Sequence, residues 1–211
     1  MIGLFGGAFD PVHFGHLRPA LEVFEALSLD EIRFIPLNQA PHKRQPALPA
    51  ETRYRMLQSA LGGQPGFVAD RCEIDRGGVS WTVDTLTEKR QRLGASTPLA
   101  LLLGSDAFAG LPAWRNWLEI LEKAHIIVMK RPGGEIDESA FPKGYIQSRI
   151  VRDPRRLGEQ PAGSIVQMEV TQLAISSSQI RQLLDQRRSV RYLVPETEAE
   201  ALQEQWEATT R

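Results

Sequence analysis

The sequence has little cysteine and no excess of charge of one sign. Cys72 is the single cysteine among 211 residues, which excludes an intrachain disulfide and a cluster of thiolate metal ligands and is typical of a reducing compartment. The 25 basic and 26 acidic residues give a formal net charge of -1. A protein that mainly binds nucleic acid is usually basic overall, so this class is disfavoured.

Long hydrophobic runs are also lacking. The longest ones, at 99–103 and 126–129, are far shorter than the roughly 20 residues of a membrane span. The first 16 residues lack a basic segment and carry Asp10 and two histidines where a signal peptide would be apolar. We therefore expect a soluble, cytoplasmic protein that forms one domain over residues 1–211.

Short apolar runs alternate with helical patterns along the chain. Runs bounded by glycine or proline indicate buried strands at 2–5, 32–36, 99–103 and 126–129, with a more polar edge strand at 165–170. Apolar residues recur at helical spacing within 17–24, 56–61, 83–93, 180–184 and 197–207, the last with a capping box of Thr197 and Glu200. This alternation predicts an α/β fold with a doubly wound parallel sheet and a small C-terminal helical part from about residue 176. Ligands of such sheets bind beyond the carboxyl ends of the strands.

The first junction between strand and helix reads GGAFDPVHFGH, from Gly6 to His16. Because the first turn of a helix tolerates proline, Pro19 predicts a helix that begins near Gly15 or His16. His13 and His16 then lie close to a helix N-terminus, where free N–H groups favour anions. The pair has three interpretations: a structural hydrogen-bonding feature, a metal-binding pair, or a phosphate site, which we favour. The spacing matches neither a dinucleotide-binding glycine motif nor a P-loop.

A second candidate anion site lies at 175–181, with the sequence ISSSQIR. Ser176 and Gln179 can form a capping box, which is the simpler interpretation. Arg181, however, lies near the first helical turn, where a cation opposes the helix dipole unless an anion accompanies it. Hydroxyl groups, free N–H groups and a guanidinium together suit a phosphate. Segments this far apart in the chain can meet at one edge of a doubly wound sheet.

Both segments resemble motifs of the nucleotidylyltransferase superfamily. The first resembles its (T/H)xGH signature, and the second resembles its Ile-Ser-Ser-Thr-x-Ile-Arg motif, with Ser178 in place of threonine. The resemblance implies a Rossmann-like fold in which the two histidines contact the phosphates of a nucleoside triphosphate. It extends from residue 1 to about 195.

The middle of the chain resembles the nicotinate mononucleotide adenylyltransferase branch of that superfamily. The matching segments are PHK at 41–43 with Arg53 and Met56, WTVDTL at 81–86, LGSDAF at 103–108 with LPAW at 111–114, and YLVP at 192–195. The resemblance implies catalytic roles for His13, His16, Lys43 and Arg181. It implies ATP binding by Gly6, Gly7, Phe9, Gly104, Asp106, Ile175, Ser176, Ser177 and Ser178. It implies mononucleotide binding by Ala8, Lys43, Trp81, Thr82, Thr85, Trp114 and Arg115.

Several of these residues also have a simpler structural interpretation. Trp114 can belong to a core stripe, Asp106 can cap a helix, and Lys43 can be a solvated loop charge. Among the residues without an implied role, Trp117 is expected in the core and His125 in a structural position. We expect Arg53 and Arg55 on a solvated helix face, and the Cys72 thiol to be inert.

The resemblance implies that the protein transfers the adenylyl group of ATP to nicotinate mononucleotide, which gives deamido-NAD and pyrophosphate. The attacking 5′-phosphate is already anionic, so positioning and electrostatic stabilisation suffice without an enzyme nucleophile. Mg²⁺ is expected as a bridge between ATP phosphates, without a dedicated protein site. The alternatives are a sister enzyme, such as pantetheine-phosphate adenylyltransferase or a cytidylyltransferase, and a non-catalytic nucleotide-sensing module.

Overall fold

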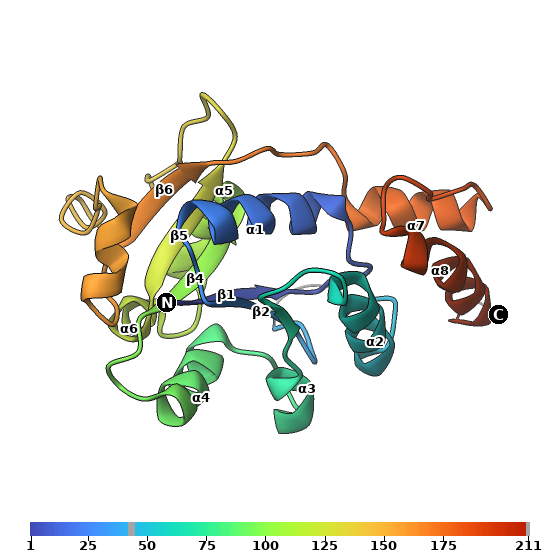
Figure 1. Cartoon of the computed structure of the whole chain (residues 1–211), viewed down its shortest axis with the longest axis horizontal. Helices are drawn as coiled ribbons and strands as arrows, with labels where there is room; N and C mark the ends of the chain where they lie inside the picture. The colour runs from blue at the N-terminus through green and yellow to red at the C-terminus, as the bar shows by residue number, and fades with distance from the viewer. Residues whose placement is uncertain (42–44, 210–211) are drawn as a thin grey trace.

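A six-stranded parallel sheet forms the centre of the protein (Figure 1). The structure, a computed structural model, describes residues 1–41 and 45–209. The strands are β1 (Ile2–Gly7), β2 (Glu31–Pro36), β3 (Phe67–Ala69), β4 (Leu99–Gly104), β5 (His125–Lys130) and β6 (Ile165–Glu169). They lie in the order β3-β2-β1-β4-β5-β6, and all neighbours are parallel. The predicted doubly wound sheet is confirmed, with β6 at one edge.

Both faces of the sheet are buried, which explains the continuous apolar runs in the sequence. Leu4 and Leu101 belong to the hydrophobic cluster on one face, whereas Phe5 and Leu102 belong to the cluster on the other. Successive side chains of a strand point to opposite faces, so every position in such a strand has to be apolar.

Helices cover the two faces of the sheet. They are α1 (Phe14–Ala26), α2 (Ala50–Leu61), α3 (Cys72–Arg76), α4 (Thr82–Leu93), α5 (Ser105–Ala109), α6 (Trp117–Lys123), α7 (Ser177–Asp185) and α8 (Glu196–Thr209), with 3-10 segments at Leu111–Ala113 and Pro154–Glu159. In Figure 1, α1 lies on one side of the sheet and α4 on the other. Within the described ranges, no helix has the length and apolar composition needed to cross a membrane.

The strand order reverses between β1 and β4. These two strands are neighbours in the sheet, although β1 ends at Gly7 and β4 begins at Leu99. The chain runs outward from β1 to β3, returns to β4 and then runs outward on the other side to β6. Connections therefore diverge at the carboxyl ends of β1 and β4 and leave a crevice between them. The first motif begins at this edge, because Gly6 and Gly7 end β1 and His13 is the N-cap of α1.

A separate hydrophobic cluster joins the C-terminal helices to α2. Its buried residues are Leu48, Met56, Ile180, Leu184, Val190, Val194, Ala199, Leu202 and Trp206. Figure 1 shows α7 and α8 beside α2, at one end of the sheet. This packing fixes the position of α7, which carries the second motif.

Three local predictions were wrong or incomplete. The short edge strand β3 was not predicted, because three residues give too little periodicity. Helix α1 begins at Phe14, so Pro19 lies inside it rather than in its first turn; only one helical hydrogen bond, to the carbonyl of Gly15, is lost. Helix α8 begins at Glu196, so Thr197 lies within the helix and is not its N-cap.

Candidate active site

The two candidate anion sites lie against each other. A Cβ atom on Gly15 would be 2.9 Å from the His13 ring and 3.0 Å from the carbonyl oxygen of Ile175, so only glycine permits this approach. The hydroxyl of Ser177 donates a 3.0 Å hydrogen bond to the carbonyl of Pro11. Segments more than 160 residues apart are thus joined at the carboxyl edge of the sheet, as the sequence predicted.

His13 and His16 form a stacked pair at the start of α1. Their ring centroids are 3.8 Å apart, with 27° between the planes. Burial lowers the pKa of His13 to about 4, and burial together with the neighbouring His13 lowers the pKa of His16 to about 3. Both rings are therefore neutral at pH 7 in the free protein. Nδ1 of each ring is buried and has no hydrogen-bond partner among the described residues, which does not favour the purely structural interpretation.

Arg181 reaches from α7 to the first motif. Its guanidinium donates to the carbonyl of Asp10 at 2.6 Å and to the Ser178 hydroxyl at 3.3 Å, and it lies 3.4 Å from the Asp10 carboxylate. The buried Asp10 carboxylate also accepts hydrogen bonds from the amides of Ala47 and Leu48, at 2.7 and 3.0 Å. Arg181 stays partly exposed, so it can contact a ligand while Asp10 holds it in place.

Ser176 is the N-cap of α7, as predicted. Its hydroxyl accepts a 3.1 Å hydrogen bond from the amide of Gln179, which lies in the first turn of the helix. Ser176 and Ser178 accept hydrogen bonds, from the Gln179 amide and from Arg181, and keep their own hydroxyl protons, whereas Ser177 donates its proton to the carbonyl of Pro11.

The ends of β1 and β4 provide room beside the histidines. Cβ atoms added to Gly6 and Gly104 would have no protein atom within 4 Å, so both positions face open space. Asp106 is exposed in the first turn of α5. Phe9, in contrast, is buried and packs edge-on against His16 with 5.1 Å between the rings. Any contact of Phe9 with ATP would therefore be made by its backbone atoms, because the ring is buried.

A cavity of about 360 Å³ opens next to this edge. Its lining contains the described residues expected to bind the mononucleotide, namely Ala8, Trp81, Thr82, Thr85, Trp114 and Arg115. Gly6, Gly7 and Gly104 line it as well, so the cavity is continuous with the ends of β1 and β4. Lys43 lies outside the described residues.

The N-terminus of α4 opens at this cavity. Trp81 is the N-cap residue, and no side chain caps the first amides of the helix. Those amides are suited to an anionic group of a ligand, because a helix N-terminus carries a partial positive charge. The exposed Arg115 lies over the Trp81 ring at 5.4 Å and 3.8 Å from the Asp84 carboxylate.

Trp117, His125 and Cys72 lie in the structural positions that the sequence predicted. The Trp117 ring contacts Phe141 and Tyr145, with centroid distances of 5.7 and 4.9 Å, so it is part of a packed aromatic cluster. His125 is fully buried, and its ring nitrogens bond the carbonyl of Gln160 and the amide of Ser164. The Cys72 thiol is buried with a pKa raised to about 12, as expected of an unreactive thiol.

The prediction for Arg53 was wrong. Its side chain is 1% exposed rather than solvated, and its guanidinium donates to the carbonyls of Ala8, Leu37 and Leu48 at 2.7, 2.7 and 3.0 Å. It thus joins both ends of the 37–48 segment to the first motif. Arg55, two residues later on the same helix, is exposed as predicted.

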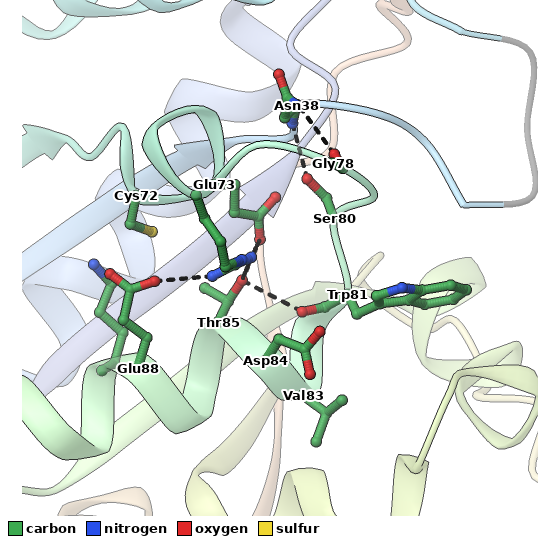
Figure 2. A network of polar contacts seen from close by, with 12 residues as sticks. Asn38, Cys72, Glu73, Gly78, Ser80, Trp81, Val83, Asp84, Thr85 and Glu88 are labelled. Carbon is green, nitrogen blue, oxygen red and sulfur yellow. Dashed lines mark hydrogen bonds and ion pairs between the residues drawn. The ribbon is translucent and has the colours of Figure 1, made fainter.

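Sequence reasoning also missed Glu73. This carboxyl is buried and lines the cavity, and the Thr85 hydroxyl bonds it at 2.6 Å (Figure 2). An acidic residue in a short helix resembles an ordinary surface position. One feature of the sequence could have indicated a role for Glu73. It lies four residues before Gly77 and Gly78, which lead into the segment of Trp81.

Comparison with known proteins agrees with this geometry. The model of the cytidylyltransferase-like family matches residues 4–183. The chain belongs to this family. A relative from Methylococcus capsulatus, described as a probable nicotinate-nucleotide adenylyltransferase, is 48% identical over 203 residues, or 96% of each chain. One from Pseudomonas fluorescens with the same description is 45% identical over 195 residues, which span 92% of this chain and 91% of the relative.

Solved structures show the same fold. Nicotinic acid mononucleotide adenylyltransferase from Plasmodium falciparum, in complex with NaAD, superposes with a TM-score of 0.72 at 18% identity and covers 98% of this chain and 97% of its own. The same protein complexed with APC gives a TM-score of 0.70 at 18% identity, over 98% of this chain and 96% of its own. At this identity the likeness establishes the architecture, and the assignment of substrates rests on the closer relatives and on the site.

Proposed function

We propose that the protein transfers the adenylyl group of ATP to nicotinate mononucleotide, with deamido-NAD and pyrophosphate as products, as a step of NAD biosynthesis. One observation carries the proposal. The edge with His13, His16 and Arg181 adjoins a cavity lined by Trp81 and Trp114, so a triphosphate and a pyridine nucleotide can be bound side by side. The relatives at 45–48% identity support the same substrates.

The two histidines act as neutral hydrogen-bond donors in this proposal. Their lowered pKa values leave one proton on each ring, and Nδ1 is buried in both, so we assign the proton to Nε2. His16 contacts the α-phosphate, where charge develops as the 5′-phosphate of the mononucleotide attacks. His13 contacts the rest of the triphosphate.

Pyrophosphate leaves from the side of α7. Arg181, the hydroxyl of Ser178 and the backbone amide of Ser177 at the helix N-terminus bind the β- and γ-phosphates. Gly6 and Gly104 have no side chain, so ATP can approach the ends of β1 and β4 closely. Asp106 accepts hydrogen bonds from the hydroxyl groups of a ribose. Lys43 contributes a further positive charge at the phosphates.

Mg²⁺ fits this site as an ion brought by the nucleotide. Among the described residues, no cluster of three or more His, Cys, Asp or Glu side chains could hold a metal. Asp10, the carboxylate beside the histidines, is engaged by two amides and by Arg181. When bound, Mg²⁺ would neutralise negative charge on the phosphates, while Arg181 and the helix N-terminus of α7 would position them.

The acid form of the mononucleotide is the preferred acceptor. Trp114 stacks on the pyridine ring and cannot distinguish a carboxylate from a carboxamide, because both rings present a similar face. The uncapped amides at the start of α4 and the segment after Trp114 are donors, and a carboxylate only accepts. A carboxamide would place N–H against N–H and leave a donor unpaired.

Release of pyrophosphate from ATP with a panel of acceptors tests the proposal. We expect turnover with nicotinate mononucleotide and none with 4′-phosphopantetheine. Turnover with phosphopantetheine, or with CTP and a phosphorylated alcohol, would instead identify a sister enzyme. ATP binding without turnover of any acceptor would point to a nucleotide-sensing module.

A further inference from the structure

Glu73 lines the cavity and is buried, whereas Arg115, the other charged residue in the described lining, is exposed. The reaction proposed above does not use Glu73. Burial raises its pKa above the ordinary range of a carboxyl, while hydrogen bonds from the hydroxyls of Thr85 and Ser80 act in the opposite direction. A buried carboxylate beside a pocket for an anionic substrate repels that substrate. Its position therefore calls for a compensating role.

The hydrogen bonds around Thr85 have one consistent direction. Arg76 carries only donors, so at 2.8 Å it must donate to the Thr85 hydroxyl oxygen. The single hydroxyl proton then goes to Glu73 at 2.6 Å rather than to the carbonyl of Trp81 at 3.4 Å. In Figure 2 the Thr85 hydroxyl lies between the Glu73 carboxyl and the carbonyl of Trp81. Glu73 thus fixes the orientation of a side chain in the first turn of α4.

A second branch of the network reaches the segment after β2. The Ser80 hydroxyl accepts a 2.8 Å hydrogen bond from the amide of Asn38, and it is one of the groups that lower the pKa of Glu73. The Asn38 side chain donates to the carbonyl of Gly78 (Figure 2), and the Ser80 amide donates to the carbonyl of Gln39. These bonds bind the 78–80 turn, which leads directly into Trp81, to the 38–39 segment.

We infer that Glu73 is a positioning residue for the acid end of the pyridine nucleotide. It holds the first turn of α4 through the Thr85 hydroxyl, so that the uncapped amides of α4 point into the cavity. Glu73 itself does not touch the substrate. The inference deepens the proposed function and rests on it.

Steady-state kinetics of Glu73→Gln provide the test, with Glu88→Gln as the control. Glu88 also bonds Arg76, at 2.9 Å, but it does not line the cavity. In Glu73→Gln the KM for nicotinate mononucleotide should rise about tenfold, the effect of one lost charge-assisted hydrogen bond. The KM for ATP should stay within about twofold of wild type, and the preference for the acid over the amide should fall. Glu88→Gln should change none of these values.

Thr85 provides an independent test that does not depend on the folding of Glu73→Gln. Thr85→Val removes the hydroxyl and should reproduce the raised KM of Glu73→Gln, whereas Thr85→Ser keeps the hydroxyl and should have a lower KM than Thr85→Val. The double variant Glu73→Gln/Thr85→Val should be no worse than either single variant, because both break the same bond.

The inference and the proposed function fail in different ways. Absence of deamido-NAD from the wild-type protein would contradict the proposed function. Wild-type turnover with an unchanged mononucleotide KM in Thr85→Val, or in a folded Glu73→Gln, would overturn the role of Glu73 alone. An equal rise in the KM for ATP would also overturn it, since that result indicates general damage to the site.

Discussion

Replacement of Arg53 by methionine should destabilise the protein far more than its position on a helix surface suggests. The guanidinium is buried and donates to three carbonyls, those of Ala8, Leu37 and Leu48. Methionine fills much of the same volume but donates nothing. Each buried carbonyl left unpaired costs about 1–3 kcal/mol. Since some of the three will regain a water partner, we expect a loss of about 3–5 kcal/mol in the free energy of unfolding.

Urea unfolding of Arg53→Met, with Arg55→Met as the matched control, measures this loss. Arg55 lies on the exposed side of the same helix, so its replacement should change the free energy of unfolding by no more than about 0.5 kcal/mol. Arg53→Lys should fall between the two, because an ammonium group cannot span carbonyls from three segments. If Arg53→Met were as stable as Arg55→Met, the network around Arg53 would not contribute to folding as argued here.

Three further predictions concern the phosphate site. His16→Ala should lower kcat by on the order of 100- to 1,000-fold with an unchanged circular dichroism spectrum, because a donor to the developing charge is lost; a kcat near wild type would exclude this role. Arg181→Ala should raise the KM for ATP about tenfold or more and spare the mononucleotide; the opposite pattern would mean that the two subsites are reversed. The third concerns pH: in the folded protein the pKa values of His13 and His16 lie at about 4 and about 3, below 6.5 in the unfolded chain, so the unfolded state takes up protons first as the pH falls. Stability from this pair is complete above pH 6.5 and declines below it, and His13→Asn/His16→Asn should lose about 2–4 kcal/mol less than wild type between pH 7 and pH 5. Equal losses in chemical denaturation would show that the rings are not buried as neutral groups.

The central sheet could be predicted because its signals are local. A strand buried on both faces is apolar at each position, as at 99–103. The meeting of the two motifs followed from the topology alone. Gly15 explains that meeting in detail, since a Cβ atom would collide with both His13 and Ile175.

The supporting residues could not be predicted, because their roles depend on partners distant in sequence. Arg53 bonds a carbonyl 45 residues away, and Glu73 bonds a hydroxyl 12 residues away. In the sequence, each resembles a charged residue on a solvated helix. Their burial follows from the packing of three segments at the edge of the sheet, which no periodicity encodes.

The preference between the two pyridine mononucleotides tests the account most directly. Wild-type protein would be supplied with ATP, Mg²⁺ and an equimolar mixture of nicotinate mononucleotide and its amide, and both dinucleotide products would be quantified by mass spectrometry. The ratio of products gives the ratio of kcat/KM values. Two mismatched contacts at about 1–3 kcal/mol each predict an excess of deamido-NAD on the order of 100-fold or more. Equal amounts of the two products, or an excess of NAD, would contradict the assignment of the uncapped amides of α4 to a carboxylate.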